Sequence, residues 1–238
     1  MSSAFDTLLA IQAHDTRLDQ IRHQLAGLAE RAARDTASDA VASIDGEIAG
    51  VTSARGDLAR RQKRLDDEIE TIAAKRAHEE ETLYGGSVTN ARALQDLQEE
   101  IESLKRRISD LEDQDLEIME QIEPLDARLA ELAVSRDEAV GVLEGCEVAL
   151  TAAEAELAVA LESEQAQRDD LTPGVDSTLL SEYESLRAAR GGVGVARLSG
   201  TQCGGCHLAL SAVEVSRIRK LADGEVTHCE ECGRLLVP

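Results

Sequence analysis

Four of the five cysteines form two C-x-x-C pairs near the C-terminus, Cys203 with Cys206 and Cys229 with Cys232. Two intervening residues let both sulfurs of a pair face one ion, and two such pairs complete a tetrahedral four-thiolate shell. A closed shell of this kind suits structural zinc, because it leaves no open position for a catalytic water. The spacing therefore predicts one structural Zn²⁺ ion, with a redox dithiol pair or an iron centre as the alternatives.

Three further residues could take part in thiol or metal chemistry. His207 and His228 each adjoin a cysteine of a pair, but four thiolates already complete the shell, so we expect both imidazoles outside it. Cys146 falls on an apolar position of a helical repeat and is expected to be a small buried hydrophobe. No Ser/His/Asp or Cys/His constellation and no nucleotide-binding loop follows from the sequence. We predict no catalytic residue, no cofactor-binding residue and no enzyme activity.

Basic residues gather around the cysteine pairs, whereas the chain as a whole has a formal charge of −22. Residues 1–172 contain 39 acids and 18 Lys or Arg, a balance that opposes contact with nucleic acid. The segment 187–220 has six basic residues and one acid, and it is the candidate surface for RNA or DNA. No aromatic residue lies near the cysteine pairs to stack on bases. The six basic residues are Arg187, Arg190, Arg197, Arg217, Arg219 and Lys220.

Apolar residues recur in alternating steps of three and four over most of the chain before the cysteines. One frame covers residues 11–28, a second covers 41–72 and a third covers 94–157. Only 1% of the residues are aromatic, and 30% are charged. This composition with this period is typical of coiled coil rather than of an ordinary globular core.

The first two frames do not join in phase. Leu28 and Val41 are thirteen residues apart, whereas two heptads span fourteen. The mismatch predicts a local irregularity over residues 32–40.

The stretch LYGGSVTNARAL, residues 83–94, interrupts the heptads between two arms of nearly equal length. Equal arms around a short glycine-containing connection favour an antiparallel hairpin, with its tip at about residues 83–91 and with residue i facing roughly residue 174 − i. Gly85-Gly86 permits positive φ, and Asn90 is a suitable cap for the second helix. Leu83 and Tyr84 are a candidate apolar contact for a partner at the tip, with turning and local packing as the alternative.

Polar residues and helix breakers interrupt the apolar seam at several positions. Pro124 lies opposite Gly50, near Gly46, which predicts a bend shared by both arms. The polar residues fix register and topology, or they bind a partner. The predicted register brings Asp115 within about one turn of Arg55, and it brings Arg136 near Asp35 and Asp39.

The C-terminal part begins at a Pro173-Gly174 linker. Ser177 is expected to cap a helix over 178–190, and the alternating stretch VGVARLSG is expected to form a strand. We further predict a helix over 212–221 and a hairpin over 224–237 that carries the second cysteine pair. The chain is therefore predicted to be mainly α, with a long antiparallel coiled-coil hairpin (1–172), and a short helix and zinc ribbon (173–238).

The start of the chain lacks a basic region followed by an apolar run, and no stretch approaches the ~18 uncharged apolar residues of a membrane span. We expect a cytoplasmic protein without membrane contact. Equal arms favour a monomeric hairpin over a parallel dimer.

The chain resembles the bacterial FlgZ-like family, in which a long coiled-coil hairpin precedes a C-terminal four-cysteine zinc ribbon. The resemblance covers essentially the whole chain and is most specific in LYGGSVTNARALQDLQEEIESLKRRISDLED, in CGGCHLAL and in CEECGRLL. It departs from the family pattern after Asn90, where Ala91-Arg92 replaces the usual Pro-Lys. The resemblance implies a ribbon near the open end of the hairpin and no enzyme activity. For FlgZ-like members it implies binding to sigma-54 and to messenger RNA.

Two functions remain open at this point. The first is a nucleic-acid-associated regulatory adaptor, linked to transcription or RNA, whose ribbon contacts phosphates. The second is a protein-binding adaptor or scaffold that acts through the acidic hairpin, for example on a sigma factor or a secretion component.

Overall fold

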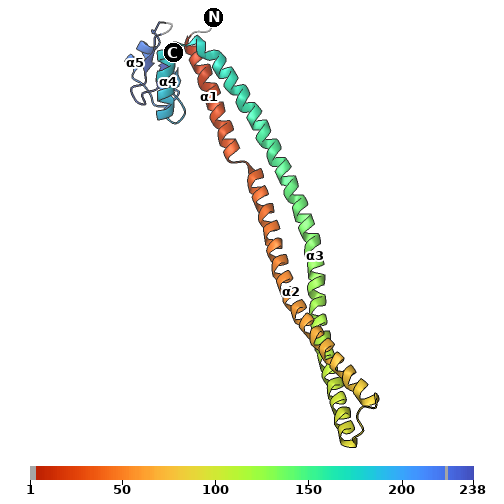
Figure 1. Ribbon diagram of the computed structural model, residues 1–238. Helices are drawn as coiled ribbons and strands as arrows, with labels where there is room; N and C mark the ends of the chain where they lie inside the picture. The colour runs from red at the N-terminus through yellow and green to blue at the C-terminus, as the bar shows by residue number, and fades with distance from the viewer. Residues whose placement is uncertain (1–3, 223–224) are drawn as a thin grey trace. The chain divides into compact units, whose positions relative to one another are not determined.

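The structure is a computed structural model that describes residues 4–222 and 225–238. Its long helices form a hairpin, and the small sheet lies in the C-terminal part (Figure 1). The helices are α1 (Ala4–Ala26), α2 (Ala29–Tyr84), α3 (Ala91–Leu171), α4 (Ser177–Ala189) and α5 (Ala212–Ile218), with a 3-10 turn, η1, at Thr172–Gly174. The strands are β1 (Val195–Ser199), β2 (Gln202–Cys203), β3 (Thr227–His228) and β4 (Leu235–Val237).

Ion pairs between α2 and α3 confirm the antiparallel register. In three of them the two residue numbers add up to 175, against the predicted 174. Each joins side chains that are roughly half exposed, so these pairs indicate register more than they stabilise the fold. They are Lys75–Glu100 at 2.5 Å, Arg107–Glu68 at 2.8 Å and Arg128–Glu47 at 3.0 Å.

Two seam arginines bond to residues that the sequence analysis did not name. Arg55 donates to Asp126 at 2.9 Å, and Arg136 donates to Asp45 at 2.6 Å. The predicted proximity of Arg55 to Asp115 and of Arg136 to Asp35 and Asp39 stays a prediction. A helical side chain leans toward the N-terminus of its own helix. Each arginine therefore reaches past the residue directly opposite, by more than one turn of the partner helix. These bonds also raise the pKa of both guanidinium groups.

The irregularity of the first arm lies earlier than predicted. The helix breaks at Gly27-Leu28, between α1 and α2, and residues 32–40 are regular helix. The Gly27 N–H donates to the carbonyls of His23 and Gln24, both at 3.1 Å, which ends α1. The predicted irregularity over residues 32–40 is therefore wrong in position, since the helix is interrupted at glycine instead.

The tip agrees with the expected turn. Gly86 has a φ of 73°, and a side chain at Gly85 would come within 2.7 Å of the Glu81 carbonyl oxygen. The Asn90 side chain accepts from the Arg92 N–H at 2.9 Å and so caps α3.

Pro124 lies inside α3, which continues through it, and Gly46 and Gly50 lie inside α2. The proline therefore ends neither the helix nor the seam. The bend at this level stays a prediction.

The chain divides into two compact units. We call the unit Met1–Ala32 with Glu147–Pro238 the base, and the unit Ala33–Cys146 the shaft. The base holds α1, the end of α3, α4 and the ribbon, whereas the shaft holds the facing parts of α2 and α3. The division into 1–172 and 173–238 stays a prediction about folding units.

The ribbon sheet has the strand order β2-β1-β4-β3. Strand β1 pairs with β2 and β4 with β3 in antiparallel fashion, and the parallel pairing of β1 with β4 joins these two hairpins. This arrangement confirms the strand predicted in VGVARLSG and the hairpin predicted over 224–237. Gly224 of that hairpin lies outside the described residues.

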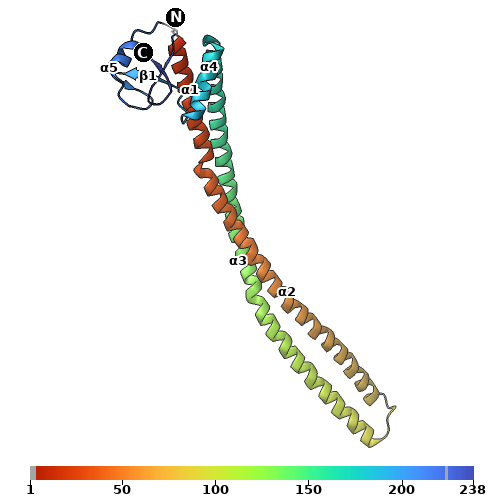
Figure 2. The ribbon, with the colours of Figure 1, turned by 90° about the vertical axis from the view of Figure 1, so that its left-hand side faces the viewer.

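Helix α1 lies between the ribbon and α4 (Figure 2), and side chains of all three form one hydrophobic core. Phe5 and Leu8 of α1 pack with Tyr183 of α4 and with Leu235 and Val237 of β4. Helix α4 begins one residue before the predicted start, because the Asp176 carboxylate rather than Ser177 caps it by accepting from the N–H groups of Thr178 and Leu179. Within the base, the ribbon is thus packed against α1 rather than tethered by a free linker.

A buried polar network reinforces this core. The carboxylate of Asp15, only 3% exposed, accepts from the Tyr183 hydroxyl at 2.7 Å and from Arg168 at 2.9 Å. The amide of Gln12 accepts from the Gly194 N–H at 2.7 Å and donates to the Gly192 carbonyl at 2.9 Å. Side chains of α1 thus hold α3, α4 and the start of β1 at once.

Candidate metal centre

The four predicted ligands come together as one cluster. Their sulfur atoms all lie within 4.8 Å of one another, with Cys203–Cys232 at 4.0 Å and Cys206–Cys229 at 3.9 Å. A tetrahedron with Zn–S bonds of about 2.3 Å requires sulfurs about 3.8 Å apart. The donor set therefore fits one tetrahedral zinc ion, and the protein carries one structural zinc.

Each cysteine pair sits in a knuckle with the same hydrogen-bond pattern. In the first, the Cys203 N–H donates to the Leu208 carbonyl at 3.1 Å and the His207 N–H donates to the Cys203 carbonyl at 2.8 Å. In the second, the Cys229 N–H donates to the Arg234 carbonyl at 2.9 Å and the Gly233 N–H donates to the Cys229 carbonyl at 2.8 Å. The two knuckles are thus repeats of one backbone turn that aims its thiolates at a shared ion.

The two histidines lie outside the ligand set, as expected. His207 is the one non-glycine residue with positive φ in the described ranges, at 61°, and its counterpart in the second knuckle is Gly233 at 72°. The turn needs a left-handed residue at this position, which an ordinary side chain disfavours. His228 instead pairs through Nε2 with Glu182 of α4 at 2.8 Å.

The thiols have different environments. Burial raises the pKa of Cys203, and it raises the pKa of Cys229 to about 12. Burial acts in the same direction on Cys232, but the backbone N–H and the guanidinium of Arg234 donate to its sulfur and lower its pKa to about 7. Zinc supplies the positive charge that keeps all four groups as thiolates.

Glycines make room for the first knuckle. A side chain at Gly204 would come within 2.7 Å of the Arg197 carbonyl oxygen, and one at Gly205 would meet the Arg234 side chain at 2.8 Å. The Gly205 N–H also donates to the Cys203 sulfur at 3.4 Å. The Gly-Gly step therefore lets β1, the knuckle and Arg234 approach closely.

Four of the six basic residues predicted for nucleic-acid contact have partners within the chain. Arg187 pairs with Asp19 and donates to the Asp15 carbonyl at 3.1 Å, and Arg197 pairs with Asp6 at 2.7 Å. These carboxylates belong to α1.

The third and fourth are held within the ribbon. Arg217 donates twice to Glu214, at 2.5 and 2.8 Å, which raises the pKa of Arg217 and lowers that of Glu214. Arg219 donates to the Gly200 carbonyl at 2.9 Å. Among the described residues, the side chains of Arg190 and Lys220 make no hydrogen bond or ion pair.

The tip candidates differ in exposure. Tyr84 is 83% exposed, and Leu83 is half-buried. The Tyr84 ring therefore contributes little to local packing, and its phenol is open to solvent.

Sequence reasoning missed the residues that organise the base. Gln12, Asp15 and Tyr183 are part of its buried network, and Phe5 is part of its core. One signal was available: Phe5 and Tyr183 are two of only three aromatic residues in the chain. Among the described residues, no helix is both long enough and apolar enough to cross a membrane.

Comparisons with known proteins agree with this architecture. Residues 11–191 match the family model of the CT398-like coiled coil hairpin domain, and residues 202–236 match that of the C4-type zinc ribbon domain. The uncharacterized protein Rv2229c of Mycobacterium tuberculosis is 33% identical over 231 residues, which cover 97% of this chain and 94% of the relative. The uncharacterized protein ML1638 of Mycobacterium leprae is 30% identical over 225 residues, with 93% and 94% coverage.

Solved structures show the same fold. A structure from Mycobacterium smegmatis is 29% identical, with a TM-score of 0.85 and full coverage of both chains. CT398 from Chlamydia trachomatis is 21% identical, with a TM-score of 0.61 and coverage of 98% of this chain and 97% of that one. The two-part architecture expected from the cysteine knuckles and the hairpin tip is thereby confirmed, and this chain belongs to the family of CT398-like coiled-coil hairpin proteins that carry a C4-type zinc ribbon.

Proposed function

We propose that this protein is a non-enzymatic, monomeric adaptor that binds a partner protein through the acidic shaft, while the zinc ribbon completes the base. The observation that carries this proposal is the occupation of four of the six basic side chains around the knuckles. Arg187, Arg197 and Arg217 neutralise carboxylates of the chain itself, and Arg219 is bonded to a carbonyl. Carboxylates of the chain therefore offset three of the six positive charges near the ribbon, which weakens the attraction of this surface for a phosphate backbone.

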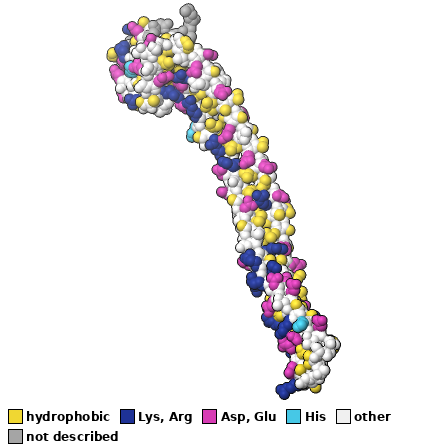
Figure 3. Space-filling view, in the orientation of Figure 1, with side chains coloured by type: hydrophobic (Ala, Val, Ile, Leu, Met, Phe, Trp, Pro, Cys, Tyr) yellow, Lys and Arg dark blue, Asp and Glu magenta, His cyan; other side chains and the backbone are white. Residues whose placement is uncertain are grey.

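The shaft offers the larger recognition surface. It contains 28 acids and 14 Lys or Arg. Leu116 and Met119 are among the large apolar side chains that are exposed. Figure 3 shows hydrophobic side chains lying among acidic and basic ones along the long helices. An apolar centre with a charged rim is the usual composition of a protein-binding surface. Neither family matched by the chain is an enzyme fold, and the closed thiolate shell leaves no position for a substrate.

Site-specific photo-crosslinking in the full-length protein tests this proposal. A crosslinking amino acid replaces Asp113 in the shaft, Tyr84 at the tip or Lys220 in the ribbon, three exposed positions. We expect nuclease-resistant protein adducts from the shaft position and few from the ribbon. Nucleic-acid adducts at position 220, lost in high salt, would instead support the nucleic-acid-associated regulatory adaptor.

The tip position separates two forms of the proposal. Adducts at position 84 alone would place binding at the exposed tyrosine, and adducts at position 113 alone would place it along the shaft. Absence of protein adducts at both positions contradicts the proposal.

A further inference from the structure

The shaft presents two flanks of different chemical character at the same level of the hairpin. On α3, residues 114, 117 and 121 lie on one side of the α2–α3 seam, whereas residues 116, 119 and 123 lie on the other, as the helical period requires. Each flank is hollowed. One groove is lined by both arms, with Arg61 and Arg64 on its rim, and the other is formed mostly by α3.

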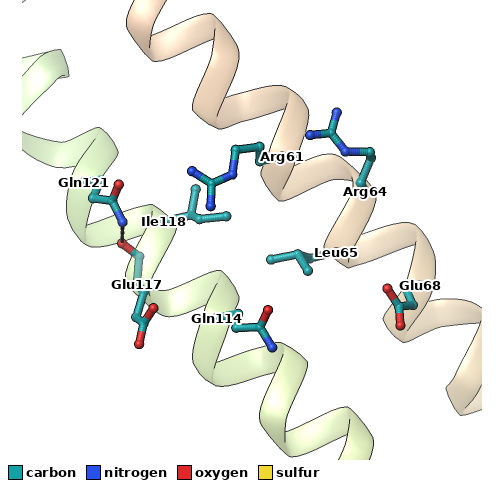
Figure 4. A pocket seen from close by; sticks show the side chains of 8 residues that line it. All are labelled: Arg61, Arg64, Leu65, Glu68, Gln114, Glu117, Ile118 and Gln121. Carbon is teal, nitrogen blue, oxygen red and sulfur yellow. Dashed lines mark hydrogen bonds between the residues drawn. The ribbon is translucent and has the colours of Figure 1, made fainter.

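The first groove is lined by charges of both signs. Figure 4 shows Arg61 of α2 reaching toward α3, while Arg64 and Glu68 of α2 and Gln114, Glu117 and Gln121 of α3 complete the lining. Both arginines are exposed, and among the described residues neither makes an ion pair. Across the seam, Leu65 and Ile118 approach each other and close its floor. Because two arginines and two glutamates line this groove, its charge favours neither a basic nor an acidic ligand.

The second groove is apolar and acid-rimmed. It has a volume of about 560 Å³, and Leu116, Met119 and Ile122 form its apolar surface. Leu116 is 56% exposed and Met119 is 49% exposed, although the seam residue Ile118 between them is 3% exposed. These two side chains lie off the heptad frame, so packing of the hairpin does not require them to be apolar. Methionine is also adaptable, and it is common at surfaces that accommodate partner side chains.

The charge around this groove has a single sign. Residues 108–127 contain eight acids and no Lys or Arg. Of the eight, only Asp126 makes an ion pair within the described ranges, with Arg55. Glu120 and Glu123 line the groove and keep their carboxylates free. An acidic rim selects cationic partners, because opposite charges accelerate association and like charges disfavour the binding of acidic partners.

We propose that this groove, Gln62 and residues 116–126 of α3, binds a basic amphipathic helix of a partner protein. The apolar stripe of the helix packs on Leu116, Met119 and Ile122, and its Lys and Arg residues pair with Glu120 and Glu123. The groove extends over ten residue steps of α3, about 15 Å at 1.5 Å per residue, so it accommodates roughly three turns of a helix. This inference rests on the proposed adaptor function and specifies the chemistry of the partner.

A defined peptide tests the groove in the full-length protein. The probe is a fluorescent peptide of about 18 residues, or five turns, with Leu in one stripe and Lys elsewhere. A peptide of the same composition in scrambled order controls for charge alone. We expect the amphipathic peptide to bind about tenfold more tightly than the scrambled one, since only the former presents an apolar face.

Two pairs of variants locate the binding. Leu116→Ser with Met119→Ser should weaken peptide binding about tenfold, as expected for loss of two central anchors. The matched control, Val134→Ser with Val142→Ser, changes residues of the same helix that are 60% and 61% exposed and lie outside the groove, and it should leave binding unchanged. Circular dichroism checks that helix content is the same in all variants.

The rim is tested by Glu120→Gln with Glu123→Gln, against Glu138→Gln with Glu144→Gln elsewhere on α3. The first pair should lower affinity about threefold and flatten its dependence on salt, while the second should not. Equal binding of the scrambled peptide, or unchanged binding to the Leu116/Met119 variant, overturns the inference. The inference is also overturned if sedimentation shows that the protein dimerises without peptide and that the Leu116/Met119 variant abolishes the dimer.

The outcome separates this inference from the adaptor proposal itself. If the groove variants bind the peptide normally while position 113 still crosslinks a protein, the adaptor function stands and the groove assignment fails. If position 113 and the tip crosslink no protein, the adaptor proposal fails regardless of what the peptide does.

Discussion

The base and the shaft are built from the same long helices but are stabilised in different ways. The base has a layered core in which Leu8, Tyr183 and Leu235 are fully buried, together with a satisfied polar network and a metal centre. In the shaft, the described side chains that are buried belong to a single seam, and the ion pairs that link its arms are exposed. Burial rather than surface charge determines stability, since exposed pairs contribute only about 0–1 kcal/mol each. The base therefore anchors the fold, and the shaft is left free to present a surface.

Removal of zinc should give the largest loss of stability, and this loss should be limited to the base. Chelation, or Cys203→Ser, removes a contribution of about 10–16 kcal/mol of the kind measured for structural zinc sites. We expect loss of amide-exchange protection in β1, β4 and α5, with helix protection retained in the shaft. Cys146→Ser, outside the cluster, is the control. Protection that survives chelation in the ribbon would show that its core, not the ion, holds the sheet.

The second test compares a buried carboxylate with an exposed one. Asp15→Ala removes the acceptor of the buried Tyr183 hydroxyl and one of the two carboxylates that Arg168 contacts, the other being Glu184. This loss should lower the free energy of unfolding by about 3–5 kcal/mol. Asp45→Ala breaks the exposed pair with Arg136 and should cost less than about 1 kcal/mol. Urea unfolding measures both variants. Similar losses in the two would mean that the base and the shaft do not differ as described.

The third test compares apolar side chains. Leu8→Ala creates a cavity in the core of the base and should destabilise the protein by about 2–5 kcal/mol. Val142→Ala, on the exposed face of α3, should change stability by less than about 0.5 kcal/mol. Thermal unfolding provides the measurement, and a loss below about 1 kcal/mol for Leu8→Ala would contradict a well-packed base.

The two regions also differ in how well their structure can be predicted from the sequence. The seam, the tip and the cysteine knuckles follow local spacings, so the hairpin and the zinc site could be predicted residue by residue. The base depends on contacts between segments far apart in the chain, such as Tyr183 with Asp15 and Arg197 with Asp6. Charge counts over a local window assigned Arg197 to a phosphate surface, because its partner lies 191 residues away.

The hydrogen-bond partners within the predictable part do not follow from the register alone. The register gave the opposite residues correctly, but side-chain lean directed Arg55 to Asp126 and Arg136 to Asp45. The apolar groove was missed because Leu116 and Met119 lie off the heptad frame, and a search for seams passes over such positions. They could have been found by asking which large apolar residues the seam does not use.

The fourth test uses pH to examine the base. Burial, followed by the hydrogen bond to Asp15, raises the pKa of the Tyr183 phenol. Its stabilisation is fully present below the unfolded value of about 10 and is lost as pH rises beyond it, because the unfolded phenol ionises while the folded phenol stays protonated. The free energy of unfolding should fall by up to ~1.4 kcal/mol per pH unit there.

Tyr183→Phe should remove this slope and cost about 1 kcal/mol at neutral pH through the lost hydrogen bond. Urea unfolding at about pH 8 and about pH 11 compares this variant with the wild-type protein. Lys and Cys residues titrate in both proteins, so their contributions cancel in the comparison. Tyr84→Phe, at the exposed tip, serves as the control and should keep the wild-type slope. An identical slope in Tyr183→Phe would place the pH dependence elsewhere.

The smallest expected effect lies in the seam of the shaft. The Oδ1 atom of Asp115 is buried and has no hydrogen-bond partner among the residues that the structure describes, which is an unfavourable arrangement for a carboxylate. Asp115→Leu restores an apolar seam position and should raise the free energy of unfolding by about 1 kcal/mol. If Asp115 instead fixes register, the stabilised variant should show a second species in sedimentation or a shifted spin-label distance between the arms, since polar seam residues act by disfavouring alternatives. A destabilised variant would mean that the carboxylate is satisfied in solution, and that the shaft, like the base, uses a buried charge to hold its helices together.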